Sequence, residues 1–90
     1  MKTIYKYPIP AETNQFAITM PRGARVLSFQ IQHGVPCIWA LVDTEEPVEA
    51  KNFYLVGTGH PFIFNLDYVR FIGTAQLMNG DLLLHLFERV

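Results

Sequence analysis

The chain is 90 residues long, carries a formal net charge of −1, and is half hydrophobic, with 13% aromatic and 17% charged residues. This length predicts one domain spanning residues 1–90. The seven lysines and arginines form no basic run, which argues against DNA or long-RNA binding through phosphate neutralisation. One small anion needs only one or two arginines, so binding of such a ligand stays open.

Cysteine content and hydropathy bear on the compartment in which the protein works. Cys37 is the single cysteine, so it cannot form an internal disulfide. The N-terminus shows no signal-peptide pattern, and no apolar run approaches the ~18–20 residues that a membrane span needs. We therefore expect a cytoplasmic protein without membrane contact.

Apolar residues are more numerous than one small core requires. A typical soluble domain is about 25% charged, whereas only 17% of this chain is charged. The surplus predicts an exposed apolar patch, and such patches usually mark a surface for a partner or for self-association. We expect a homo-oligomer, and the alternative is a well-filled monomeric core.

Strand signals dominate, and no segment combines a sustained helical stripe with a capping box. Short β-branched and aromatic runs alternate with Gly, Pro, Asn and Asp, and Asp43–Glu49 is expected to be an acidic loop. The predicted strands are Thr3–Tyr7, Gln15–Met20, Arg25–Gln32, Val35–Val42, Asn52–Val56, Tyr68–Met78 and Asp81–Val90. About seven short strands predict an all-β fold, either a small antiparallel sandwich or a barrel.

The central pair of strands is expected to be a hairpin with a two-residue turn at His33–Gly34, since both residues tolerate positive φ. The register that follows places Phe29 opposite Ile38 and Leu27 opposite Ala40.

The last hairpin carries the strongest local signal, because Asn-Gly is the preferred dipeptide of a type I′ turn. The Asn79–Gly80 turn pairs Leu77 with Leu82 on the core face. The opposite face pairs Gln76 with Leu83, Thr74 with His85, and Ile72 with Phe87. Because this face mixes apolar and polar side chains, it is typical of a sheet that packs against a partner. The predicted interface residues are Ile72, Leu83 and Phe87.

The sequence contains no arrangement that indicates catalysis or metal binding. The patterns C-x-x-C, H-x-H and H-E-x-x-H are absent. Cys37 lies within an apolar strand, where a small buried side chain is expected. Four of the seven candidate carboxylates lie in the acidic loop, which is typical of a solvated edge. We predict no catalytic residue, no metal site and no cofactor.

The segment Gly57–Pro61, G-T-G-H-P, has two interpretations. Its glycines allow positive φ and close approach of a ligand, and successive N–H groups can form an anion-binding nest. A P-loop is excluded, since G-x-x-x-x-G-K-[ST] is missing. The segment is therefore either a turn that needs two glycines for its geometry or a ligand-binding loop.

Six motifs resemble a family of small, largely uncharacterised phage and prophage proteins. They are K-x-I-Y-K-Y-P at Lys2–Pro8, M-P-x-G-A-x-V-L at Met20–Leu27, P-C-I-W-A-L-V-D at Pro36–Asp43, G-T-G-H-P at Gly57–Pro61, F-I-G-T-x-Q at Phe71–Gln76 and H-x-F-E at His85–Glu88. The resemblance covers nearly the whole chain. It implies a compact, phage-encoded β-domain in the cytoplasm of a bacterial host, and it carries no activity with it.

Small phage proteins often inhibit a host protein or sequester a nucleotide signal, and both roles are typically non-enzymatic. The leading hypothesis is therefore a homo-oligomeric binding module of counter-defence that sequesters a small, anionic, nucleotide-like ligand. The alternative is a protein-binding inhibitor of a host protein, or a virion-associated structural module, that uses the predicted interface. The expected ligand-binding residues are Gly57, Thr58, Gly59 and His60 as donors, Arg22, Arg25 or Arg70 for phosphate, and Trp39 or Tyr7 for base stacking.

Overall fold

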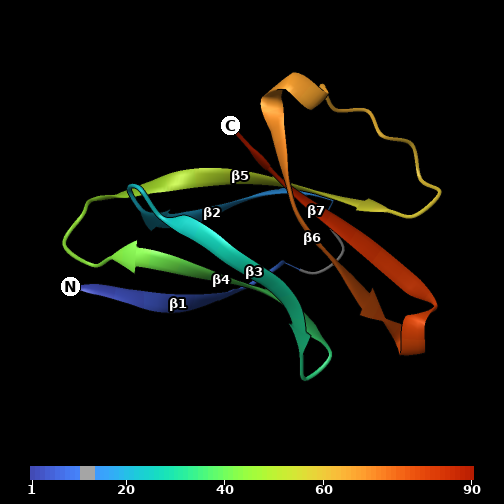
Figure 1. Cartoon of the computed structure of the whole chain (residues 1–90), viewed down its shortest axis with the longest axis horizontal. Helices are drawn as coiled ribbons and strands as arrows, with labels where there is room; N and C mark the ends of the chain where they lie inside the picture. The colour runs from blue at the N-terminus through green and yellow to red at the C-terminus, as the bar shows by residue number, and fades with distance from the viewer. Residues whose placement is uncertain (11–13) are drawn as a thin grey trace.

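The computed structural model describes residues 1–10 and 14–90 and contains seven β-strands in two antiparallel sheets (Figure 1). The strands are β1 Lys2–Pro8, β2 Gln15–Pro21, β3 Arg25–Gln32, β4 Val35–Asp43, β5 Val48–Gly57, β6 Val69–Leu77 and β7 Leu82–Arg89, with single 3-10 turns at Leu66–Tyr68 and Met78–Gly80. The predicted all-β fold is therefore confirmed. Because the two sheets do not join into a closed barrel, the form of this fold is an open sandwich.

The chain alternates between the two sheets. The first sheet has the order β1-β4-β3, and the second has the order β2-β5-β7-β6. The sheets come together along β3 and β6, which lie against each other. This arrangement gives a flattened molecule with extents of 40 × 32 × 18 Å.

The core fills the space between the sheets because each strand turns alternate apolar side chains inward. In the β2–β5 pair, for example, Phe16 stands opposite Phe53, and their rings stack with centroids 5.5 Å apart. The buried residues that form this core are Ile9, Phe16, Met20, Phe29, Ile38, Ala40, Val42, Phe53, Leu55, Ala75 and Leu86.

Both predicted hairpin turns are confirmed. His33 and Gly34 have φ values of 50° and 77° between the paired residues Gln32 and Val35. In the last hairpin, Asn79 has φ 55° and ψ 33°, Gly80 has φ 91°, and the turn closes with the Asp81 N–H donating to the Met78 carbonyl at 3.0 Å. Positive φ at both central positions is the defining feature of the type I′ turn.

Two of the predicted strand registers are wrong, and a β-bulge explains each. Phe29 does face Ile38, but Ala40 faces Val26 because Leu27 is the extra residue of a bulge. In the last hairpin, Phe87 faces Phe71 because Ile72 is the extra residue. A bulge sets two residues against one, so a register counted outward from the turn fails beyond it.

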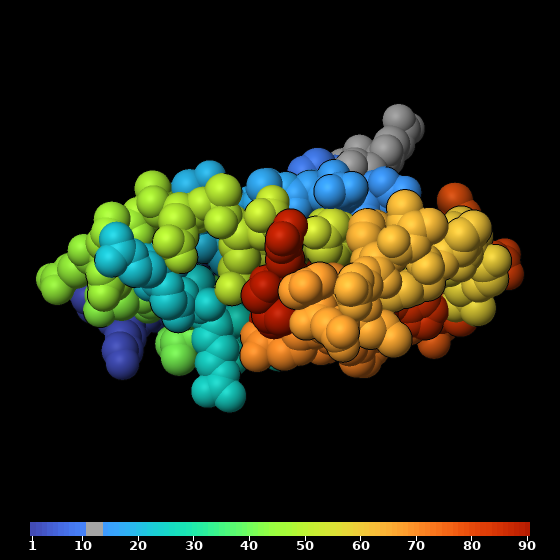
Figure 2. Space-filling model, turned by 90° about the horizontal axis from the view of Figure 1, so that it is seen from above, coloured from blue at the N-terminus to red at the C-terminus, as the bar shows by residue number. Residues whose placement is uncertain are grey.

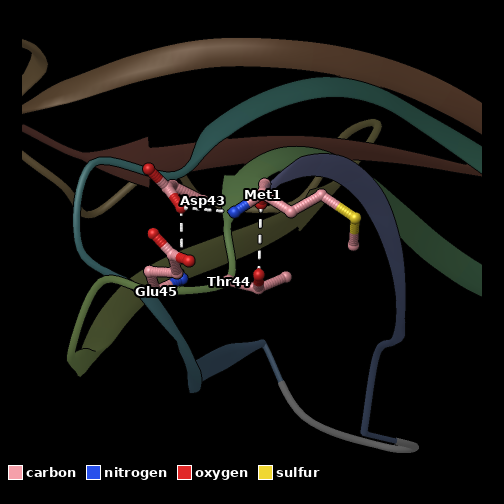
Figure 3. Close-up of polar contacts among 4 residues, drawn as sticks. All are labelled: Met1, Asp43, Thr44 and Glu45. Atoms are coloured by element: carbon pink, nitrogen blue, oxygen red, sulfur yellow. Dashed lines mark hydrogen bonds and ion pairs between the residues drawn. The ribbon is translucent and has the colours of Figure 1, made fainter.

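The fifth strand begins at Val48, four positions before its predicted start, because it pairs with β2 along its whole first half, from Val48 opposite Pro21 onward. The acidic loop is correspondingly short. Its first residues clasp the N-terminus (Figure 3). The Asp43 carboxylate accepts hydrogen bonds from the Glu45 N–H at 3.1 Å and from the Met1 ammonium at 3.3 Å. Thr44 donates to the Met1 carbonyl through its N–H at 2.9 Å and through its hydroxyl at 3.2 Å.

One charged side chain, Glu88, is buried at the inner face of β7. Its carboxylate pairs with Arg70 of β6 on one side and with Lys51 of β5, 3.3 Å away, on the other. A buried charge is stable only when it is paired in this way.

Within the described ranges, no helix has the length and apolarity to cross a membrane.

Candidate functional site: an apolar groove between the sheets

The largest of three cavities lined by described residues is a groove of about 760 Å³. Its lining residues come from the β3–β4 hairpin, from the β6–β7 hairpin, from the ends of β1 and β5, and from the segments that follow these two strands. Its lining residues are Ile9, Pro10, Asn14, Gly34, Val35, Pro36, Leu55, Gly57, His60, Leu77, Leu82 and Leu84. Most of these are apolar, so the groove offers water little to bind.

Two polar side chains, Asn14 and His60, lie in the groove wall. Both also line an adjoining pocket of about 290 Å³, which extends the groove toward Pro61 and Phe64. No Lys, Arg, Asp or Glu lies among the described residues that line either cavity. A ligand of this groove would therefore be mostly apolar, with hydrogen-bonding groups near Asn14 and His60.

The Gly57–Pro61 loop forms one end of this wall, and its glycines have identifiable geometric roles. The His60 N–H donates to the Gly57 carbonyl at 3.0 Å and closes a turn in which Gly59 has φ 83°. A Cβ at Gly57 would lie 2.7 Å from Nδ1 of His60, so the imidazole occupies the space of the missing side chain. The Thr58 N–H donates to the Leu83 carbonyl at 3.2 Å. With the His60 and Thr58 N–H groups engaged, these contacts favour the turn interpretation over the anion nest.

Thr58 points to the other face of the second sheet, where it meets His85. Its hydroxyl lies 2.7 Å from Nε2 of His85, and the Thr74 hydroxyl lies 2.8 Å from Nδ1 of the same ring. A hydroxyl can donate or accept, so either tautomer of His85 satisfies both contacts. A hydroxyl beside an imidazole is also the arrangement of a nucleophile and a base. Here the third partner is a threonine, and no described carboxylate contacts the ring. The arrangement fastens the loop to β6 and β7.

Two of the predicted phosphate-binding arginines, Arg22 and Arg25, lie far from this loop. The Arg22 N–H donates to the Pro47 carbonyl, next to the start of β5, and Arg25 begins β3 at the same end. Gly57 ends β5 nine residues later, which is roughly 30 Å at the usual rise of a strand. Arg70 is engaged by the buried Glu88 carboxylate. These arginines and the Gly57–His60 segment therefore do not form one site.

The two predicted stacking residues lie on opposite faces of the first sheet. Tyr7 pairs with the buried Ile38 and faces inward, whereas Trp39 pairs with Lys6 and is half-buried on the outer face. Burial raises the pKa of Tyr7 above its usual value, and neighbouring Tyr5 adds to the shift. One ligand cannot contact both rings.

The predicted interface residues are partly covered by the protein itself. Ile72, Leu83 and Phe87 are half-buried. Phe87 packs against Phe62 and Phe71, with ring centroids 5.2 and 5.4 Å apart. The segment between β5 and β6 thus lies over this face.

Several apolar side chains of the covering segment and of β6 remain exposed. They are Phe62, Ile63, Leu66, Tyr68 and Phe71. None of them was among the predicted interface residues. The sequence feature that could have indicated this surface is an irregular apolar run that contains the turn formers Asn65 and Asp67.

A smaller pocket of about 230 Å³ lies beneath this segment and contains an arginine that was not among the predicted ligand-binding residues. Arg89 lines it together with the aromatic rings of Tyr54, Phe64 and Tyr68. Tyr54 and Phe64 stack with centroids 4.1 Å apart. This pocket therefore combines an arginine with aromatic rings, as the predicted ligand site did, but it uses none of the predicted residues.

A known family model matches the chain over its whole length. Residues 1–90 match the model of a family described as a domain of unknown function, DUF7352. The chain belongs to this family. This confirms the expected membership of an uncharacterised family. No curated protein and no solved structure gives a match, and the description of the DUF7352 family names no activity.

Proposed function

We propose that this DUF7352 protein is a binding module that holds a small, elongated and mostly apolar molecule in the groove between its sheets. The observation that carries the proposal is the groove itself. Its volume of about 760 Å³ lies within the ~300–1,000 Å³ that is usual for small-molecule sites. Apolar walls with a few polar groups are also the common composition of such sites.

The groove walls suit a ligand with one polar end. Leu77, Leu82 and Leu84 of the β6–β7 hairpin face the ligand space from one side, and Val35 faces it from the other. His60 is held against Gly57 by packing and by its backbone hydrogen bond. A positioned imidazole can accept or donate a hydrogen bond, and it therefore suits a hydroxyl, amide or carboxyl group.

A probe with an acyl chain tests this proposal. We expect 11-(dansylamino)undecanoic acid to bind saturably, with a rise and blue shift of dansyl fluorescence. The variant Leu82→Trp fills part of the groove from a half-buried position and should weaken binding about tenfold or more, which corresponds to about 1.4 kcal/mol. The matched control is Phe71→Trp, which adds the same ring outside the groove. Equal affinity of the wild type and Leu82→Trp would contradict the proposal.

The pocket of Arg89 favours a second candidate function, the capture of a small planar anion such as a nucleotide. Its guanidinium would pair with a phosphate or carboxylate, and the rings of Tyr68 and Phe64 would stack on a base. The Arg89 guanidinium forms no ion pair or hydrogen bond within the described part of the chain.

A thermal-shift screen against mono-, di- and cyclic nucleotides tests this second function. Ligand at about 100 times its Kd adds roughly 2.7 kcal/mol, a rise in Tm of roughly 10–20 °C for a domain of this size. Arg89→Ala should abolish the rise, whereas Arg22→Ala should preserve it. A screen without any shift argues against nucleotide capture and leaves the groove as the binding site.

The biological setting rests on the resemblance described above. Phage origin, a counter-defence role and a location in the bacterial cytoplasm stay predictions. Homo-oligomerisation is likewise a prediction, and the geometry of β2 gives it a specific form.

A further inference from the structure

β2 is an edge strand whose outer side has no partner strand among the described residues. Its one neighbour in the second sheet is β5. In the space-filling view of Figure 2, β2 lies in blue along the upper rim of the molecule. An unpaired edge is a template for another strand, and natural proteins usually block it with charges, prolines or bulges.

The hydrogen bonds at the two ends of the β2–β5 ladder fix which backbone groups point outward. The Leu55 N–H donates to the Asn14 carbonyl at 2.9 Å, and the Arg22 N–H donates to the Pro47 carbonyl at 2.8 Å. Hydrogen-bonded and non-hydrogen-bonded pairs alternate in an antiparallel ladder, so the even-numbered residues of β2 bond to β5. The N–H and C=O groups of Ala17 and Thr19 therefore face away from the sheet.

The other three edges are protected, whereas this one is not. β1 carries Lys2 and Lys6. β3 and β6 each contain a bulge and lie against each other. The sequence of β2, Q-F-A-I-T-M-P, contains no charged residue, no bulge, and no proline before Pro21. Ala17 and Thr19 are small and neutral, with Ala17 exposed and Thr19 at the same edge, so they present no obstacle to an approaching strand.

We propose that two copies of the chain pair through β2, antiparallel, about a two-fold axis at Ile18. Ala17 would then form hydrogen-bonded pairs with Thr19 of the second copy, and Thr19 with Ala17 of the second copy. Each such pair exchanges two bonds, which gives about four new hydrogen bonds. The occupant is a second copy because an uncharged strand facing itself brings no like charges together, whereas β1 facing itself would bring lysines together.

The side chain at the axis supports the same pairing. Ile18 points to the inner face of the second sheet but is only half-buried, whereas its neighbours Phe16 and Met20 are buried. In the dimer, Ile18 and its symmetry mate form a non-hydrogen-bonded pair, with Cβ atoms about 4.5–5.5 Å apart. The contact would shield an apolar side chain that the monomer leaves partly open. The result is one continuous sheet across both copies. This inference is independent of the ligand groove, and the residues it uses do not line that groove.

Light scattering coupled to size exclusion, with native mass spectrometry, tests the pairing. We expect the wild type to have twice the mass of the chain. The variants Ala17→Lys/Thr19→Lys and Ala17→Glu/Thr19→Glu place like charges across the axis, and each should be monomeric by itself. Mixed together, they should form a heterodimer. Because a misfolded chain could not be rescued by its charge-reversed counterpart, the mixture separates lost pairing from lost folding.

A control and two contrary outcomes complete the test. Gln30→Lys adds the same charge to the exposed side of β3 and should leave the mass of the dimer unchanged. A monomeric wild type at high micromolar concentration would overturn the proposal. A dimer that persists in the double-lysine variant would overturn it as well, because the contact would then lie on another surface.

Discussion

Gly57 and His60 form a close contact, so the residue type at position 57 affects the shape of the groove wall. The imidazole lies where a side chain at position 57 would point, and both residues line the groove. The two residues are therefore coupled, and a change in either one should alter the tolerance of the other.

The variant Gly57→Ala should lower the free energy of unfolding by about 1–3 kcal/mol, because its Cβ overlaps the ring and forces the side chain or backbone to shift. Urea denaturation measures this loss. The same substitution made in a His60→Ala background should cost clearly less, since the overlap is gone. Equal losses in the two backgrounds would mean that the imidazole does not lie against the Gly57 backbone in solution.

At the scale of strands and loops, the sequence patterns predicted the positions of all seven strands and both hairpin turns. Alternation and turn chemistry are local properties, so they can be recognised in a single chain. The bulges at Leu27 and Ile72 were not predictable in this way, because each depends on which residue of the partner strand is opposed. The early start of β5 also depends on a partner, since the acidic segment becomes a strand only by pairing with β2.

The candidate site was predictable only in part. Gly57 and His60 were selected for their residue types, and both line the groove. The predicted arginines and aromatic residues were selected without knowledge of strand order, which separates them over both sheets and both ends. Arg89 could not be distinguished from the other arginines, because its aromatic neighbours come from β5 and from the segment between β5 and β6.

The clasp between the N-terminus and the end of β4 should respond to acid. The Glu45 N–H, and then the N-terminal ammonium, lower the pKa of Asp43 below its ordinary value of 3.8. A carboxyl whose pKa is lower in the folded state stabilises the fold at pH values above its unfolded pKa. That stabilisation is lost as the pH falls through the folded pKa, which lies below 3.8.

Comparison of Asp43→Asn with the wild type checks this expectation. The variant should have the lower Tm at neutral pH, where Asp43 is ionised. The difference in Tm should shrink toward zero as the pH is lowered below the pKa of Asp43. Thermal unfolding followed by circular dichroism at several pH values measures it. A difference that is constant with pH would assign the effect of the substitution to something other than charge.

At the scale of the whole molecule, the sandwich is closed on one side and open elsewhere. β3 and β6 hold the two sheets together, and the groove is lined by residues of both hairpins. The outer edge of β2 has no partner strand among the residues that the structure describes. Ligand and second copy would therefore use different parts of the same scaffold. A chain of this kind can bind a small molecule and dimerise without either event blocking the other.

The alternation of the chain between sheets also governs the order in which the molecule can assemble. Each sheet contains one hairpin with a short, favourable turn, β3–β4 in the first and β6–β7 in the second. These hairpins form between strands that follow each other in the chain. The pairs β1–β4 and β2–β5, in contrast, join strands that have two other strands between them in the sequence. Pairings between distant segments form slowly, since a long loop must close before any contact is gained. During synthesis, β1 and β2 leave the ribosome before β4 and β5. They therefore remain unpaired until these partner strands have been made.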